Sequence, residues 1–271
     1  MTRTEQSRQI TIRRLTSNKS IREEPDEVAL EEPLEIRIRG KAIATTMRTP
    51  GNDIDLAAGF ISTEGIIKNR RDILEIAHCI DDKTNDYRNI VNVYLHPDIE
   101  IDPEKIKRHF YTNSSCGICG KTTIESVQSL FPLIESDTLI SINELNQLPG
   151  KLRNAQDTFK LTGGLHAAAL FDINGSIVHT SEDVGRHNAV DKVIGYSVLR
   201  EIDLSSLILM VSGRISYEIM QKSLAGKIPI VAAISAPTSL AVEFADENNQ
   251  TLIGFMRNNK MNIYTGHERV Y

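Results

Sequence analysis

The chain has 271 residues, of which 40% are hydrophobic and 25% charged, and a formal net charge of −5. This length allows one large domain or two modest ones with a sizeable core, and the composition excludes a disordered chain. The acidic balance disfavours nucleic acid as a partner, so a phosphate-bearing ligand would need a local cationic pocket. No run is apolar and long enough to span a bilayer, and the first 15 residues contain no apolar leader. We therefore expect a cytoplasmic protein that does not bind membranes.

The first half of the sequence predicts a mobile tail followed by a small α+β domain. Residues 1–25 are polar with little periodicity, which is typical of a tail, and the domain is expected over 26–140. Its expected elements are a β-hairpin over 34–47 with a turn at Gly40-Lys41, a helix from Asn52 or Asp53, a strand over 89–97, and helices over 102–111 and 121–131.

The second half, from a boundary near Ser141, alternates strands and helices. After a connecting helix over 141–156, we expect strands over 167–173, 175–181, 206–212, 228–235, 251–256 and 262–266, with helices over 186–200, 214–225 and 238–247. This alternation predicts an α/β domain over 141–271 with a mostly parallel sheet covered on both faces.

Two of the three cysteines lie three residues apart in the segment SSCGICGK, residues 114–121. An odd number of cysteines argues against a disulfide framework and for a reducing compartment. The glycines allow tight turns, and a helix starting near Gly120 would place Cys116 and Cys119 at its N-terminus, where the helix dipole and Lys121 favour the thiolate. This loop therefore has the chemistry of a nucleophile.

Three other interpretations of the cysteine pair remain open. Half of a structural zinc site would need further ligands, and the sequence offers only Cys79 and scattered histidines. A thioredoxin-like dithiol should follow the first strand of a βαβ unit, whereas this pair lies between two expected helices. A zinc deaminase would need a glutamate where Ala168 follows His166, and its cysteine pair would come after the histidine. We expect no permanently bound metal.

Polar residues gather where the strands of the second half meet their helices. Arg186 and His187 open one expected helix, and Arg214 follows Ser212-Gly213 after a buried strand. In open α/β sheets ligands bind at the carboxyl ends of strands, and helix N-termini favour anions. We therefore predict one shared anion-binding edge, for which a capped helix with a solvated charged face is the simpler alternative. In GFMRNNKMNIY, residues Phe255 and 257–260 offer stacking, hydrogen bonds and charge for a nucleotide, or form a simple hairpin turn.

Taken in order, SSCGICGK, TGGLHAAAL, EDVGRHNAVDKVIG, SGRISYEIMQK, IPIVAAISAPTSLAVE and GFMRNNKMNIYTG resemble the FdhD family, the accessory sulfurtransferases of formate dehydrogenase. The resemblance extends from about residue 30 to the C-terminus. It implies a cytoplasmic homodimer whose C-terminal α/β domain is similar to cytidine deaminases, preceded by the smaller α+β domain that carries the CxxC loop.

The resemblance also implies a reaction. A cysteine desulfurase would pass sulfane sulfur to Cys116, with Cys119 assisting, and the chain would deliver it to the molybdenum or tungsten of a bis(molybdopterin guanine dinucleotide) cofactor before insertion into formate dehydrogenase. The stretch 255–260 matches the family's cofactor-binding segment, so the resemblance assigns the cofactor to the following residues: Phe255, Met256, Arg257, Asn258, Asn259 and Lys260. We expect Arg186, His187 and Arg214 to contribute. The alternative is a chaperone that holds the cofactor without transferring sulfur.

Overall fold

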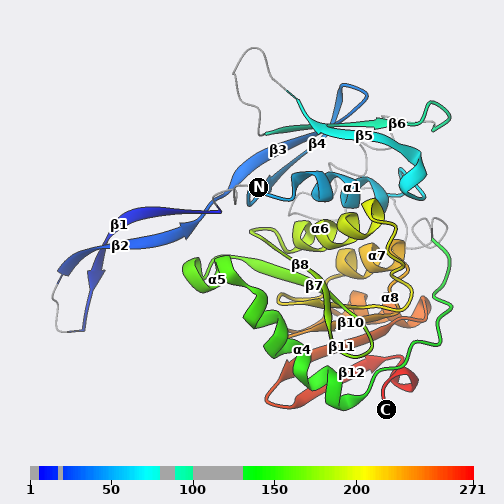
Figure 1. Cartoon of the computed structure of the whole chain (residues 1–271). Coiled ribbons are helices and arrows are strands. Elements are labelled where there is room, and N and C mark those ends of the chain that lie inside the picture. The colour runs from blue at the N-terminus through cyan, green and yellow to red at the C-terminus, as the bar shows by residue number, and fades with distance from the viewer. Residues whose placement is uncertain (1–5, 18–20, 80–88, 100–130) are drawn as a thin grey trace.

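The computed structural model describes residues 6–17, 21–79, 89–99 and 131–271. Within these ranges the chain forms a mixed α/β structure with sheets of two, four and six strands. Figure 1 shows the four-stranded sheet above helix α1, then a layer of helices, then the six-stranded sheet with helix α4 beneath it.

The N-terminal residues form a hairpin that projects from the body (Figure 1). Strands β1 (Ser7–Leu15) and β2 (Ile21–Ala29) pair antiparallel, and their cross-strand ion pairs join Arg13 to Glu23 and Arg14 to Glu24. The sequence predicted no strand here, because opposite charges on paired strands stabilise a ladder without apolar alternation. The mobility expected for 1–25 stays a prediction.

The four-stranded sheet has the order β4-β3-β6-β5, and α1 covers one of its faces. Its strands are β3 (Glu32–Ile38), β4 (Lys41–Arg48), β5 (Ile73–His78) and β6 (Ile90–Leu95); α1 spans Asp53–Thr63, and the 3-10 helix η1 spans Arg70–Asp72. The predicted hairpin is confirmed, but its turn lies at Arg39 and Gly40, where φ is 48° and 79°, one residue before the predicted Gly40-Lys41. Leu34, Ile36 and Ile38 point toward α1 and are buried, as their alternation predicts.

The six-stranded sheet has the order β12-β11-β10-β9-β7-β8. Its strands are β7 (His166–Phe171), β8 (Ile177–Asp183), β9 (Ile208–Val211), β10 (Ile230–Ala233), β11 (Thr251–Arg257) and β12 (Lys260–Thr265). Strand β10 pairs parallel with β9 and β11, but the β7–β8, β7–β9 and β11–β12 pairs are antiparallel. The prediction of a mostly parallel sheet is therefore wrong, because β7 lies between β8 and β9 and runs against both.

Helices cover both faces of this sheet, as predicted. One face packs against α6 (Arg186–Leu199), α7 (Tyr217–Ala225) and α8 (Ser239–Glu247), and the other packs against α4 (Ile142–Ala155). Ser141 caps α4 by accepting a hydrogen bond from the Glu144 amide at 3.1 Å. The short helices α5 (Asp157–Thr162) and η2 (His267–Arg269) complete the described chain. Among the helices described, none combines the length and hydrophobicity that a membrane crossing requires.

The two large sheets are joined through a close crossing of α1 and α6. A Cβ atom on Gly59 would lie 1.8 Å from the Asp191 carbonyl oxygen, and one on Gly195 would lie 1.8 Å from the Asp55 carbonyl oxygen. Only glycine fits at these two positions. Beside this crossing, the buried Lys222 of α7 pairs with Asp191 of α6 at 2.9 Å and donates to the Thr63 hydroxyl of α1 at 3.0 Å.

Residues 131–140, which the sequence places in the N-terminal domain, pack on the C-terminal sheet. Ile134 is 3% exposed within the core around α6, α7 and α8, and its amide donates to the Asn248 carbonyl at 3.2 Å. Ile140 is fully buried in the core beside α4. Ile134 and Ile140 therefore pack with the C-terminal sheet, and the domain boundary near Ser141 stays a prediction.

Candidate functional site

One edge of the six-stranded sheet collects the polar loops predicted from the sequence. Strands β9, β10 and β11 are parallel, so their carboxyl ends share this edge. Strand β7 runs in the opposite direction, which places its first residue, His166, at the same edge, paired with Asp183 at the end of β8. We call His166 and the loops 184–187, 212–216, 234–238 and 255–260 the polar rim.

Hydrogen bonds link successive loops of the polar rim. The Ser212 hydroxyl accepts from the Ala167 amide at 2.9 Å, and the Ile215 amide donates to the Ala236 carbonyl at 3.1 Å. Farther along, the Phe255 amide donates to the Ser235 carbonyl at 3.0 Å. The predicted shared edge is therefore a continuous backbone framework from β7 to β11.

Arg186 and His187 begin α6, as the sequence predicts. Gly185 caps this helix without a side chain, so the first amides of α6 are left for a ligand or water. The Arg186 Nε atom is buried and has no hydrogen-bond partner among the described residues. An anion at this position would satisfy a buried donor and complement the helix dipole.

The His187 ring is half-buried between α6 and α7, where Nε2 lies 3.3 Å from the Ser216 hydroxyl and 3.9 Å from the Glu218 carboxylate. Burial, followed by the charges of Arg186 and Lys222, lowers the pKa of His187 from 6.5 to about 4. The ring is therefore neutral at physiological pH and offers a neutral hydrogen-bonding group.

His166 joins the polar rim although the sequence did not single it out as a ligand. A Cβ atom on Gly213 would lie 3.2 Å from His166 Nδ1 and 3.7 Å from the Arg186 Cβ, so these three residues are neighbours. Burial, followed by the charge of Arg186, lowers the pKa of His166. The sequence indicated only that His166 lies at the start of an apolar strand after Gly163-Gly164. The pairing of β7 with β9 was needed to place this residue at the polar rim.

Residues 255–260 form the tip of the β11–β12 hairpin. Asn258 and Asn259 occupy the turn with φ of 54° and 56°, and both are exposed with Arg257 and Lys260. Phe255 is 37% exposed, so its ring is available for stacking. Met256 is 1% exposed and packs in the core beside α4. The Met256 side chain therefore anchors the hairpin in the core, and the exposed side chains of 255–260 are the candidates for ligand contact in this segment.

Arg214 follows β9 and is exposed beside the Gly213 turn, so its guanidinium is accessible at the polar rim. The predicted thiols Cys116 and Cys119, with the whole loop 114–121, lie outside the described residues. The third thiol, Cys79, is free and partly buried at the end of β5. Among the residues that the structure describes, no group of three or more His, Cys, Asp or Glu side chains is arranged to hold a metal ion.

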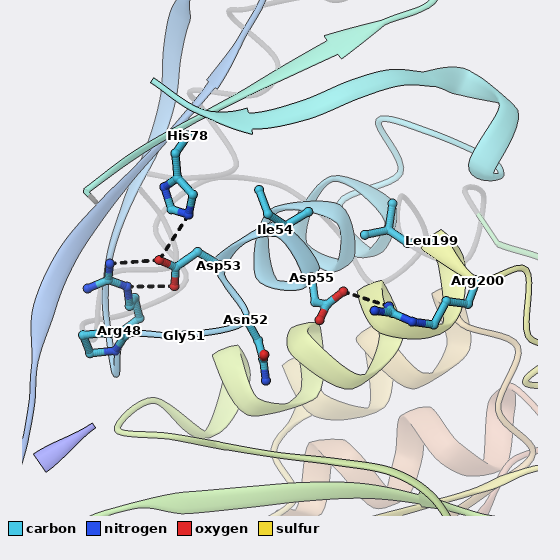
Figure 2. Close-up of a pocket in the computed structure, with 10 residues that line it drawn as sticks. Arg48, Gly51, Asn52, Asp53, Ile54, Asp55, His78, Leu199 and Arg200 are labelled. Atoms are coloured by element: carbon cyan, nitrogen blue, oxygen red, sulfur yellow. Dashed lines mark hydrogen bonds and ion pairs between the residues drawn. The ribbon is translucent and has the colours of Figure 1, made fainter. Parts of the chain in front are cut away.

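A separate cavity of about 620 Å³ opens beside the start of α1 (Figure 2). Its charged side chains pair with one another: Arg48 binds Asp53 at 3.0 Å, and Arg200 binds Asp55 at 3.1 Å. His78 lies 3.8 Å from Asp53. Because these charged groups are already paired with one another, the cavity presents fewer groups that a ligand could bind than the polar rim does.

The family model described as FdhD/NarQ matches residues 29–271. A protein named sulfur carrier protein FdhD from Mycolicibacterium paratuberculosis is 45% identical over 272 residues, covering 97% of this chain and 99% of the relative. One of the same name from Sulfolobus acidocaldarius is 45% identical over 90% of this chain and 91% of the relative. The crystal structure of a formate dehydrogenase accessory protein from Desulfotalea psychrophila has the same fold, with a TM-score of 0.79 at 24% identity over 98% of this chain and all of the other.

Proposed function

Because this chain belongs to the FdhD/NarQ family, we propose that it is a cytoplasmic sulfur carrier for the maturation of a formate dehydrogenase. The sequence supports this with the pair Cys116 and Cys119, and the relatives support it through their names. The observation that carries the cofactor part of the proposal is the polar rim, which gathers Arg186, His187 and Arg214 at one sheet edge with the hairpin 255–260.

In the first step, the Cys116 thiolate attacks the outer sulfur of a persulfide on a cysteine desulfurase. The sulfur–sulfur bond of the donor breaks, the donor cysteine leaves as a thiolate, and Cys116 carries the sulfane sulfur as its own persulfide. No electrons are gained or lost overall. The reaction needs an accessible cysteine of low pKa, which the glycine-containing sequence around Cys116 favours.

In the second step, the Cys119 thiolate attacks the inner sulfur of the Cys116 persulfide. This forms a Cys116–Cys119 disulfide and releases hydrosulfide, so the two thiols supply the two electrons that reduce the sulfane sulfur to sulfide. The sulfide becomes a ligand of the molybdenum or tungsten of the cofactor, and an external thiol reductant restores the dithiol.

The cargo, a bis(molybdopterin guanine dinucleotide) cofactor, carries two pyrophosphates and two guanines. The Arg186 Nε has no hydrogen-bond partner within the described part of the chain. We propose that this atom, the first amides of α6 and the exposed Arg214 and Arg257 hold the phosphates of the cofactor, while Phe255 stacks on a guanine. The neutral His187 adds a hydrogen bond without repelling the cationic side chains. A cationic edge of this kind suits a protein whose net charge is −5.

We further propose that the C-terminal unit is related to cytidine deaminases and that the protein acts as a homodimer. The position of His166 at the start of β7 fits the first relationship, and Ala168 in place of a glutamate removes the hydrolytic acid–base group.

Maturation of formate dehydrogenase with cysteine variants tests the sulfur-transfer function. We expect Cys116→Ala to abolish activation of the apo-enzyme and Arg257→Ala to weaken activation through cofactor binding. If both Cys116→Ala and Cys119→Ala activate formate dehydrogenase as the wild type does, the chain is instead a chaperone that only holds the cofactor.

A further inference from the structure

We propose that the end of β4 and the residue that follows it, together Thr46–Thr49, position the anion-binding start of α6 through Asn188 and Asp183. The inference rests on the proposed function, because it concerns how Arg186 and His187 of the polar rim are held. We use N-terminal unit for the four-stranded sheet β4-β3-β6-β5 and α1. The inference gives this unit a part in ligand binding, although it contributes none of the predicted residues of the polar rim.

Asp183 connects the two units at the end of β8. Its carboxylate is fully buried and forms an ion pair with Lys192 at 2.7 Å. It also accepts hydrogen bonds from the Gly185 amide at 2.8 Å and from the Thr49 amide at 3.2 Å. A buried carboxylate is tolerated only with such partners, so the backbone of Thr49 and the start of α6 are fixed relative to each other.

Asn188 makes a second connection from the first turn of α6. Its side-chain amide donates to Asp183 at 3.0 Å and to the Met47 carbonyl at 2.8 Å. Its amide oxygen accepts from the Thr46 hydroxyl at 3.2 Å. Asn188 is 9% exposed, so water does little to replace these bonds.

The backbone on both sides of Arg186 and His187 is therefore held by the N-terminal unit. Val184 donates its amide to the Thr49 hydroxyl at 3.2 Å, and Lys192 donates to the Thr49 carbonyl at 2.9 Å. Gly185 fits closely against Asn188, since a Cβ there would lie 2.9 Å from the Asn188 amide nitrogen. Asn188 and Asp183 are thus positioning residues: they orient the groups that bind the ligand and do not bind it themselves.

Thr46→Val tests this assignment with little change in shape. It removes the hydroxyl that fixes Asn188, and Thr46→Ser restores a hydroxyl. The control is Thr63→Val, which removes a more deeply buried hydroxyl that donates to Asp191 of α6 at 2.8 Å and accepts from Lys222 at 3.0 Å. The probe is GDP, which contains the guanine nucleoside and the pyrophosphate of the cofactor.

We expect Thr46→Val to bind GDP roughly three- to tenfold more weakly than the wild type, because a small misplacement of binding groups is costly. Thr46→Ser is expected to recover the affinity, and Thr63→Val to stay within about twofold while losing comparable stability. In histidine-selective NMR spectra, the ring resonances of His187 are expected to move in Thr46→Val and to return in Thr46→Ser. A purely structural contribution would not produce this rescue at His187.

Unchanged GDP affinity together with unchanged His187 resonances in Thr46→Val would overturn the assignment. If Thr46→Val does not fold, Asn188→Ala takes its place, and wild-type GDP affinity and His187 resonances in that variant would equally overturn it. Failure of the wild type to bind GDP would instead contradict the proposed cofactor site, and the His187 resonances would still decide whether β4 positions the start of α6.

Discussion

Replacement of Gly59 by alanine is expected to destabilise the crossing of α1 and α6. The added Cβ would lie 1.8 Å from the Asp191 carbonyl oxygen, whereas Cβ contacts below 3.0 Å essentially do not occur. The two helices would have to separate by more than about 1 Å, and overpacking of this kind costs about 3 kcal/mol. The higher helix propensity of alanine offsets about 0.5–1 kcal/mol of this loss in the free energy of unfolding. The net loss of about 2 kcal/mol or more corresponds to a fall in Tm of about 4–8 °C.

Thermal unfolding followed by circular dichroism measures this effect. The matched control is Gly150→Ala, which lies in α4, is exposed, and would place its Cβ more than 4 Å from any neighbour. Gly150→Ala is expected to raise Tm by about 1–3 °C through helix propensity alone. A Gly59→Ala variant that unfolds at or above the wild-type temperature would refute the close helix crossing that the structure describes.

Three further predictions follow from buried groups. Burial, with the charge of Arg200, lowers the pKa of His179 from 6.5 to about 4. Between these two pH values the unfolded chain binds more protons than the folded chain, so the free energy of unfolding falls as the pH drops from 6.5 to 4. His179→Phe keeps a ring against Tyr196 and should flatten this fall when unfolding is measured as a function of pH. Met256→Ala should lower the free energy of unfolding, measured with urea, by about 2–5 kcal/mol. Arg257→Ala should change this free energy by less than about 0.5 kcal/mol and should weaken GDP binding. The opposite pattern would place the Met256 side chain at the ligand. Lys222→Met should cost about 3–5 kcal/mol because it leaves Asp191 buried and unpaired, and wild-type stability in this variant would contradict that pairing.

Elements with a strong local pattern were predictable from the sequence. The alternation of Leu34, Ile36 and Ile38 predicted β3, and the helical spacing after Arg186 predicted α6. Strand direction was not predictable, because a short apolar run such as β9 has the same pattern in a parallel or an antiparallel pair. The antiparallel position of β7 depends on contacts with β9 that lie some 40 residues away in sequence.

The candidate site follows the same division. Arg186, His187 and Arg214 were predictable because each follows a strand and precedes a helix. Asp183 looked like one charge in a polar run, because its partner Thr49 is 134 residues away in sequence. Met256 was assigned to the ligand with its neighbours, since a bulge between Gly254 and Arg257 changes which side chains point inward and no local pattern signals it.

The hairpin of β1 and β2 was missed for a related reason. Its side chains are mostly exposed on both faces, so the strands lack the apolar alternation that identifies a half-buried strand. The pairing of Arg13 with Glu23 becomes visible only when the register is known. Cross-strand charge pairs can therefore identify two strands only after their pairing register is known.

The central claim is that Cys116 carries sulfur as a persulfide, and intact-protein mass spectrometry tests it most directly. The chain is incubated with a cysteine desulfurase and cysteine, and its mass is measured before and after reduction. We expect Cys119→Ala, which cannot release the sulfur as hydrosulfide, to gain one sulfur atom that a thiol reductant removes, and Cys116→Ala to gain none. A Cys119→Ala chain that never gains sulfur, or a Cys116→Ala chain that gains it as readily as Cys119→Ala, would contradict the claim.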